Sequence, residues 1–440
     1  MSRAVPIGVA TKYSPPANLT FWKFNAGPSQ RDVYYRGGTK QQRPVPPDQG
    51  VFIEMSTVCN PVRKIAKIAI GLATAAFLAA CEPGATGRGP SIDTSEPIPV
   101  ALLVPQSSDP SLAQSLENAA RLAMADLQNA RIDLRVYDTA GNPNTAAASA
   151  QQAVADGAKV ILGPVYAQAA NAAGLAVLSK NVNVLSFSNN TSIAGGNVFV
   201  LGPTFDNTAR RLVNFAGRQG KSKMVVVYSN DAAGQLGRTA IANALSGSRV
   251  ANAGEVGFDR SQQGVIDAVP AIKATVDQTG ADSMFLTATT AGALPLFTQL
   301  LPEAGVSPAM VQYIGLTRWD IPAQTLELPG VQGGWFALPD PAKAQAYRQR
   351  YNATYGEAPH PISGLAYDGI AAIGALASQG KSNALSAAAL TQNAGFQGVG
   401  GIFRLRPDGT NERGLAVATI QNKQVVVIDP APQSFSGAGF

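Results

Sequence analysis

The sequence predicts an α/β protein built as two doubly wound lobes joined by a hinge, and three observations indicate this fold. Short apolar runs alternate with segments of helical spacing, which is typical of βαβ units and parallel sheets. The runs are apolar throughout, as in strands covered by helices on both faces. The alternation begins near residue 97 and restarts after Phe205, which indicates a second lobe.

The first series opens with a buried strand at Val100–Val104 and a helix over Leu112–Leu127, whose apolar residues recur at helical spacing. The elements expected after these are strand Asp133–Tyr137, helix Asn144–Val154 with Asn144 as its cap, strand Val160–Leu162, helix Ala167–Leu178 and strand Val184–Ser186.

The second series repeats the rhythm. Its expected helices are Thr208–Gly217, Leu236–Leu245, Val265–Val276 and Leu294–Leu301, and its strands are Met224–Tyr228, Ser283–Leu286 and Val311–Ile314. Two later helices are expected at Pro341–Tyr355 and Ile362–Ala377. Three apolar runs separated by polar turns then predict an antiparallel meander over Gly401–Leu405, Gly414–Ile420 and Val425–Ile428.

An export signal lies inside the chain, around Cys81. Arg63, Lys64 and Lys67 form a basic segment, an apolar stretch follows, and small residues precede the cysteine. Translation from Met55 gives this signal the N-terminal position that export requires. The alternatives are a transmembrane anchor, although Ile65–Ala80 is shorter than the roughly 20 residues of a spanning helix, or a buried core helix.

The predicted organisation follows from these boundaries. We expect a disordered extension from an upstream start (1–54), a signal peptide (55–80), a tether (81–96), a first lobe (97–205 and 337–392), a second lobe (206–336 and 393–430) and a flexible tail (431–440). Residues 1–80 hold ten Lys/Arg against three Asp/Glu, so the formal charge of +6 belongs to the leader. The lobes are nearly neutral, which argues against a nucleic acid partner.

Few residues are suited to catalysis. The two cysteines, Cys59 and Cys81, precede the lobes, so these have no disulfide and no cysteine metal site. The single histidine, His360, lies in an Ala-Pro-His-Pro turn without a nucleophile motif beside it. No phosphate-binding loop or metalloprotease motif occurs. We expect no enzymatic activity, no cofactor and no metal.

Ligands of open α/β sheets bind beyond the carboxyl ends of the strands, so we expect the site in the cleft between the lobes. The first-lobe candidates are Gln106, Ser107, Asp138, Pro164, Tyr166, Ser186, Ser188, Asn189 and Asn190. The second-lobe candidates are Asn230, Asp231, Thr287, Thr289, Thr317, Arg318 and Trp319.

Several of these residues have a structural alternative. Asn189 and Asn190 suit a turn as well as a ligand contact, and Asp231 suits a helix N-cap. Trp319 suits either the core or a stacking platform. Asp368, after Tyr367, is expected to be structural and to join a late helix to the sheet.

Several stretches resemble the type I periplasmic binding proteins of the leucine-binding group. They include "VYDTAGNPNTAAASAQQAVADGAKVILGPV", "VVVYSNDAAGQLGR", "LAYDGIAAIGAL" and "GFQGVGGIFRLRPDGTNERGLAVATIQNKQVVVID". The resemblance runs from about Pro97 to Asp429 and implies two Rossmann-like lobes with a hinge. The stretches "ILGPVYAQAANAAG" and "FSNNTSIAGGNVFVLGPTFDNTARRL" are similar to the penicillin-binding protein activators, a lipoprotein branch of that group.

The resemblance also implies an anchor and partners. Leu78–Cys81 resembles a lipobox, which implies lipidation of Cys81 and attachment on the periplasmic side, and Glu82 is typical of outer-membrane sorting in Gram-negative bacteria. The activator branch implies contact with a penicillin-binding protein that synthesises peptidoglycan. The alternatives are a receptor of an ABC importer, with an ABC permease as partner and a small polar ligand, or a sensor that signals to a membrane partner.

The sequence departs from the amino-acid receptors of this group. Tyr166 and Ala167 stand where their Ser/Thr cluster is expected, and Thr317 stands near the place of an acidic residue that pairs the ligand ammonium. Because a buried charge without a partner is costly, a free amino acid is a poor fit. A neutral polar ligand, a sugar-peptide fragment or no ligand fits better.

Overall fold

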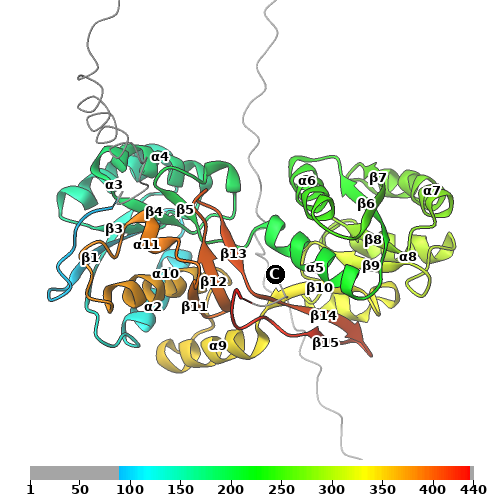
Figure 1. Cartoon of the computed structure of the whole chain (residues 1–440). Helices are drawn as coiled ribbons and strands as arrows, with labels where there is room; N and C mark the ends of the chain where they lie inside the picture. The colour runs from blue at the N-terminus through cyan, green and yellow to red at the C-terminus, as the bar shows by residue number, and fades with distance from the viewer. Residues whose placement is uncertain (1–88, 437–440) are drawn as a thin grey trace, which may run out of the picture. The chain divides into compact units, whose positions relative to one another are not determined.

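The computed structural model describes residues 89–436, in which a parallel sheet and a mixed sheet form the centres of two lobes (Figure 1). The predicted extension, signal peptide and Cys81 lie outside the described residues, as does the end of the tail. Among residues 89–436, no helix is both long and apolar enough to cross a membrane.

The first lobe is a five-stranded parallel sheet in the order β2-β1-β3-β4-β5. Its strands are β1 Ile98–Val104, β2 Ile132–Asp138, β3 Val160–Leu162, β4 Asn183–Ser186 and β5 Val198–Val200. Helices α3 (Pro143–Ala155) and α4 (Ala167–Val177) pack on one face, and α2 (Pro110–Met124) and α10 (Gly364–Ala377) pack on the other (Figure 1).

Alternating side chains of the first-lobe strands supply two separate cores. Leu102 and Leu162 face the side of α2 and α10, whereas Leu103 and Ile161 face the small alanines of α3 and α4. Both faces are therefore buried, which explains why the strands read as continuous apolar runs. The predicted cap of α3 is corrected from Asn144 to Asn142, whose side chain accepts from the N–H groups of Asn144 and Thr145.

The second lobe is a seven-stranded mixed sheet in the order β15-β14-β10-β9-β8-β6-β7. Its strands are β6 Lys223–Ser229, β7 Ala251–Phe258, β8 Ser283–Leu286, β9 Gln312–Gly315, β10 Trp335–Pro339, β14 Leu415–Gln421 and β15 Gln424–Asp429. Strands β6 to β10 are parallel, whereas β14 pairs antiparallel with β10 and β15 pairs antiparallel with β14. The helices are α5 Phe205–Arg218 and α6 Ala232–Ser246 on one face, and α7 Gln262–Thr279 and α8 Leu294–Glu303 on the other.

A third, antiparallel sheet joins β11 (Phe396–Gly398), β12 (Gly401–Leu405) and β13 (Asn411–Arg413). The remaining elements are α9 Pro341–Tyr355, α11 Ala387–Leu390 and the short 3₁₀ turns η1 Leu178–Lys180, η2 Thr191–Ile193, η3 Ala323–Glu327 and η4 Pro329–Val331. The predicted meander is thus divided between two sheets, since β12 belongs to this one and β14 and β15 to the second lobe.

The structure places residues 393–413 differently from the expected second-lobe assignment. Phe396, Phe403 and Leu405 are buried in the first-lobe core beside α10. Their packing ties β11 and β12 to the first lobe, so only the chain from β14 onward belongs to the second sheet. Strand β10 lies in the second-lobe sheet up to Pro339, although residues from 337 were expected in the first lobe.

The segments expected to be a tether and a flexible tail are packed where the structure describes them. Ile92 is 5% exposed in the first-lobe core, and its N–H donates to the carbonyl of Ser382. Ala431 is buried in the second-lobe core, and the Arg404 guanidinium lies 4.4 Å from the Phe435 ring centroid. Apolar contact outweighs the loose Gly/Pro/Ser composition of these segments.

Replacing Ile92 with alanine tests whether the packing of the segment around this residue contributes to stability. We expect Ile92→Ala to lower the free energy of unfolding by about 2 kcal/mol, because a buried aliphatic side chain is lost. Leu175→Ala, at a side chain 65% exposed on α4, should change it by less than about 0.5 kcal/mol. Urea denaturation followed by circular dichroism measures both, and equal effects of the two variants would contradict the packing of Ile92 in the first-lobe core.

Candidate functional site

The predicted first-lobe residues lie at one edge of the sheet, because β1 to β4 run parallel and end on the same side. The backbone N–H of Ser107, after β1, donates to Asp138 Oδ1 at the end of β2 over 3.2 Å. Gln106 and Ser107 are exposed, Asp138 is half-buried and Tyr166 is half-buried at the start of α4. The structure therefore brings the loops after β1, β2 and β3 to a common edge.

The carboxylate of Asp138 accepts hydrogen bonds from its own loop and from the loop after β1. Burial alone would raise the pKa of its carboxyl, but hydrogen bonds from Ser107 and from the backbone N–H of Ala140 outweigh burial and hold the pKa below its ordinary value. The carboxylate thus stays charged at neutral pH, and it already accepts two backbone N–H groups.

Two of the predicted serines hold the loop after β4 rather than projecting from it. Ser186 Oγ donates to the carbonyl of Pro164 over 3.0 Å and accepts from the N–H of Ser188. Ser188 Oγ accepts from the N–H of Asn190, which in turn caps η2 through Ser192. Both serines are buried, so their hydroxyls position the loop, whereas Asn189, which follows Ser188, is exposed.

The start of α4 differs from that of its neighbours. Asp109 caps α2 and Asn142 caps α3, whereas Tyr166 occupies the N-cap position of α4 and no side chain caps that helix. Backbone N–H groups in the first helical turn need an acceptor, and here they follow the carboxyl end of β3. Burial raises the pKa of Tyr166, so its phenol stays protonated at neutral pH.

The charged groups of the second-lobe loops are paired within that lobe. Asp231 caps α6 through the N–H of Gly234 and forms a 2.7 Å ion pair with Arg260. Burial opposes ionisation, but the bonds from Ser229, Gly234 and Arg260 hold the pKa of Asp231 below its ordinary value. Asn230 Nδ2 donates to Asp259 over 2.7 Å. The N-cap alternative for Asp231 is therefore confirmed.

The remaining carboxylate of these loops, Asp320, pairs with Arg318. Thr287 is buried, and its hydroxyl accepts from the N–H of Ser229 over 3.1 Å, whereas Thr289 is exposed beyond the end of β8. Asp138, Asp231 and Asp320 thus each accept from a donor of their own lobe.

Thr317 and Trp319 follow β9 and differ in what they offer. Trp319 is fully buried, and a Cβ placed on Gly315 or on Gly334 would come within 2.2 Å of its indole. The indole thus fills a slot between two glycines and belongs to the core, so the stacking alternative is wrong. Thr317 Oγ1 and Trp319 Nε1 are the buried side-chain polar atoms without a hydrogen-bond partner in residues 89–436.

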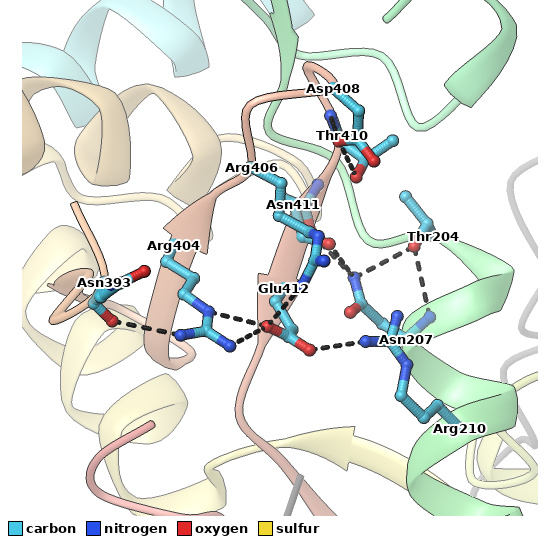
Figure 2. Close-up of polar contacts among 10 residues, drawn as sticks. All are labelled: Thr204, Asn207, Arg210, Asn393, Arg404, Arg406, Asp408, Thr410, Asn411 and Glu412. Carbon is cyan, nitrogen blue, oxygen red and sulfur yellow. Dashed lines mark hydrogen bonds and ion pairs between the residues drawn. The ribbon is translucent and has the colours of Figure 1, made fainter. Parts of the chain in front are cut away.

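The segments that connect the lobes were not anticipated as a functional element, yet they carry a polar network around Glu412 (Figure 2). Glu412, on β13, is 4% exposed and forms ion pairs with Arg210 of α5 and Arg404 of β12, both at 2.5 Å, and with Arg406 at 3.3 Å. A buried carboxylate is tolerated when charged partners surround it. The three arginines thus fix β13 where the chain leaves the first lobe for β14.

The residues flanking Glu412 bind the other segment that connects the lobes. Asn411 Nδ2 donates to the carbonyls of Val200 and Gly202, and its Oδ1 accepts from Asn207 at 2.8 Å (Figure 2). Arg413 donates to the carbonyl of Leu201 and pairs with Asp368, which is 1% exposed. The structural expectation for Asp368 is thereby confirmed.

His360 also has a structural environment. Its backbone N–H donates to Ser115, its carbonyl accepts from Ser363, and burial lowers the pKa of its imidazole. Within residues 89–436, no group of three or more His, Cys, Asp or Glu side chains is placed to hold a metal ion.

Neutralising Glu412 tests the importance of the hinge network. We expect Glu412→Gln to lower the free energy of unfolding by about 2 kcal/mol, because three partly exposed arginines lose the buried carboxylate that they share. The matched control is Glu255→Gln, whose ion pair with Arg238 is partly exposed and should contribute less than about 1 kcal/mol. Urea denaturation of both variants distinguishes the two, and a loss no larger than that of the control would contradict the assignment.

Comparisons with known proteins agree with this architecture. The profile of the periplasmic binding protein family matches residues 97–424, whereas the search of curated proteins found no match. A branched-chain amino acid ABC transporter structure from Rhodospirillum rubrum superposes with a TM-score of 0.64 at 16% identity, covering 76% of this chain and all of that one.

Two further structures show the same fold. The branched-chain amino acid ABC transporter periplasmic ligand-binding protein of Burkholderia xenovorans has a TM-score of 0.58 at 19% identity, covering 77% of this chain and 97% of that chain. An ABC transporter substrate-binding protein from Desulfitobacterium hafniense, in complex with Leu, has 0.55 at 19%, covering 76% and 100%. The family match over most of the described residues, with this shared two-lobe fold, shows that the chain belongs to the periplasmic binding protein family.

Proposed function

We propose that the protein is a non-enzymatic solute-binding receptor of an ABC importer, and that its solute is small, polar and without an ammonium group. The family membership and the transport-related fold neighbours support the receptor role. The observation that carries the solute class is the pairing of the carboxylates at the ligand edge. Asp138, Asp231 and Asp320 each already accept from donors of their own lobe.

An ammonium group is strongly hydrated, and a site must replace its water with a carboxylate or several acceptors. The edge offers instead neutral donors and acceptors: the amides of Gln106 and Asn189, the hydroxyls of Thr289 and Thr317, and the N–H groups that open α4. Such groups suit hydroxyl, amide or carboxylate functions. An ammonium group could pair with Asp231 or Asp320 only by displacing Arg260 or Arg318. At Asp138 it would have to compete with the two backbone N–H groups that Oδ1 already accepts.

The penicillin-binding protein activator role remains a second proposal for the same chain. It is favoured by the stretches similar to that branch and by the missing partner for an amino-acid ammonium. In that role the lobes contact a peptidoglycan synthase and transport nothing. Both proposals place the lobes on the periplasmic side, anchored through a lipidated Cys81, with the outer membrane as the expected destination.

A thermal-shift screen of the purified protein tests the receptor proposal. We expect neutral polyols, sugars, amides and small carboxylates to include a compound that raises the melting temperature, because a ligand that binds only the folded state stabilises it. Leucine and other free amino acids should leave it unchanged. A shift with leucine would overturn the solute class. No shift with any compound, together with capture of a penicillin-binding protein by the lipidated chain, would favour the activator role.

The unpartnered hydroxyl of Thr317 gives a residue-level prediction. We expect Thr317→Val to weaken binding of the solute found in the screen by about tenfold, since one hydrogen bond is lost, while the stability of the free protein is unchanged or higher. Thr287→Val is the contrast, because it leaves the Ser229 N–H without its acceptor and should lower stability instead. Isothermal titration and thermal melting measure both, and unchanged affinity in Thr317→Val would remove Thr317 from the site.

A further inference from the structure

Strand β15 forms an outer edge of the second-lobe sheet and is unusually apolar for such a position. It pairs with β14 on one side only, and no other strand of residues 89–436 pairs with its outer side (Figure 1). Val426, Val427 and Ile428 are 36%, 41% and 37% exposed. Proteins usually protect such edges with lysine, proline or a covering segment, because unpaired backbone groups attract another strand.

The hairpin turn determines which backbone groups point outward. Asn422 and Lys423 both have positive φ, at 51° and 62°, as in a type I′ turn. In such a turn the N–H of Gln424 points back to Gln421, so Val426 also faces β14, because the direction alternates along an antiparallel strand. The N–H and C=O of Val425 and Val427 therefore face away from β14.

A hydrogen bond on the far side of β14 agrees with this direction. Ile420 is the partner of Val425, and its carbonyl accepts from the N–H of Gly333, on the side of β14 away from β15. The pair Ile420 and Val425 is thus a non-hydrogen-bonded pair of the hairpin, which leaves the backbone groups of Val425 available.

We propose that β15 is a self-association surface, on which β15 of a second copy of this chain pairs antiparallel about a two-fold axis at Val426. In that register Val425 lies opposite Val427 of the second copy and exchanges both N–H···O bonds with it, and the symmetry repeats the exchange. Each outward-facing group of Val425 and Val427 is then satisfied. An interface of this kind presents the same patch from both subunits.

The ends of the strand favour this register. The apolar centre is flanked at one end by the ion pair of Lys423 with Glu327, and at the other by Asp429 with Arg211 and Arg218. An axis at Val426 brings the Lys423 end of one copy to the Asp429 end of the second, so side chains of opposite charge meet at each end. The register shift of the hairpin falls beyond Val427, so it lies outside the two residues that exchange backbone bonds.

A disulfide trap tests the register directly. At the axis, the two Val426 residues form a non-hydrogen-bonded pair, whose Cα atoms lie about 4.5 Å apart, within the range of a disulfide. In the full-length chain carrying Cys59→Ser and Cys81→Ser, we expect Val426→Cys to form disulfide-linked dimers under mild oxidation. The control Leu236→Cys replaces a more exposed side chain, at 56%, on α6, and should cross-link at least about tenfold more slowly.

A second variant measures the association without a covalent bond. Sedimentation of the unmodified chain over a concentration series should show a monomer–dimer equilibrium. Val426→Lys should shift it to the monomer, because it places two like charges at the axis, whereas Leu236→Lys should not. A monomeric unmodified chain at all concentrations, or equal cross-linking of the two cysteine variants, would overturn the proposal. Solute binding in the thermal-shift screen is read independently, so either proposal can fail without the other.

Discussion

The buried charge of Glu412 is the constraint on which the arrangement of the connecting segments depends. Strand β13 leaves the first lobe for β14, and a carboxylate that is 4% exposed must be neutralised where it lies. Arg210 of α5, Arg404 of β12 and Arg406 in the turn after β12 do this. Asn411 and Arg413 at the same time satisfy carbonyls of the other connection, at Val200, Leu201 and Gly202. The two connecting segments, at Val200–Gly202 and Asn411–Arg413, do not pair in a sheet with each other. Their side chains hold them together instead.

The loops at the carboxyl edges of the two sheets are held largely by contacts within their own lobe. In the first lobe, Ser186 binds the Pro164 carbonyl and the Ser188 N–H. Hydrogen bonds engage the carboxylate of Asp138, and ion pairs engage those of Asp231 and Asp320. In the proposed receptor, a solute would therefore meet amides, hydroxyls and the first N–H groups of α4. The electrostatics of the edge thus follow from local folding needs rather than from contacts between the lobes.

The fold class was predictable from the sequence because the central strands, such as β1, β3 and β8, are covered on both faces and read as uninterrupted apolar runs. The strand β10 was not predicted, since Trp335 to Pro339 is short and directly follows glycines. The loop after β4 was expected to reach the ligand, but a serine hydroxyl can bind a ligand or a loop backbone equally well, and only the folded structure distinguishes the two. Glu412 was missed for a related reason: Arg404 and Arg406 are near it in sequence, but Arg210 is 202 residues away, and no local pattern indicates that the three converge.

The direction of β14 and β15 follows from where the chain passes between the lobes. Strand β10 carries the chain out of the second lobe, ending at Pro339, and β14 brings it back, beginning at Leu415, so these two residues pair and the strands are necessarily antiparallel. A further parallel strand would need a crossover of a dozen or more residues, whereas a hairpin needs two. The chain takes the hairpin through Asn422 and Lys423. An otherwise parallel sheet therefore ends in a strand that pairs antiparallel with its neighbour. The exposed edge of β15, with its apolar side chains and unpaired backbone groups, is a direct consequence of how the lobes are joined.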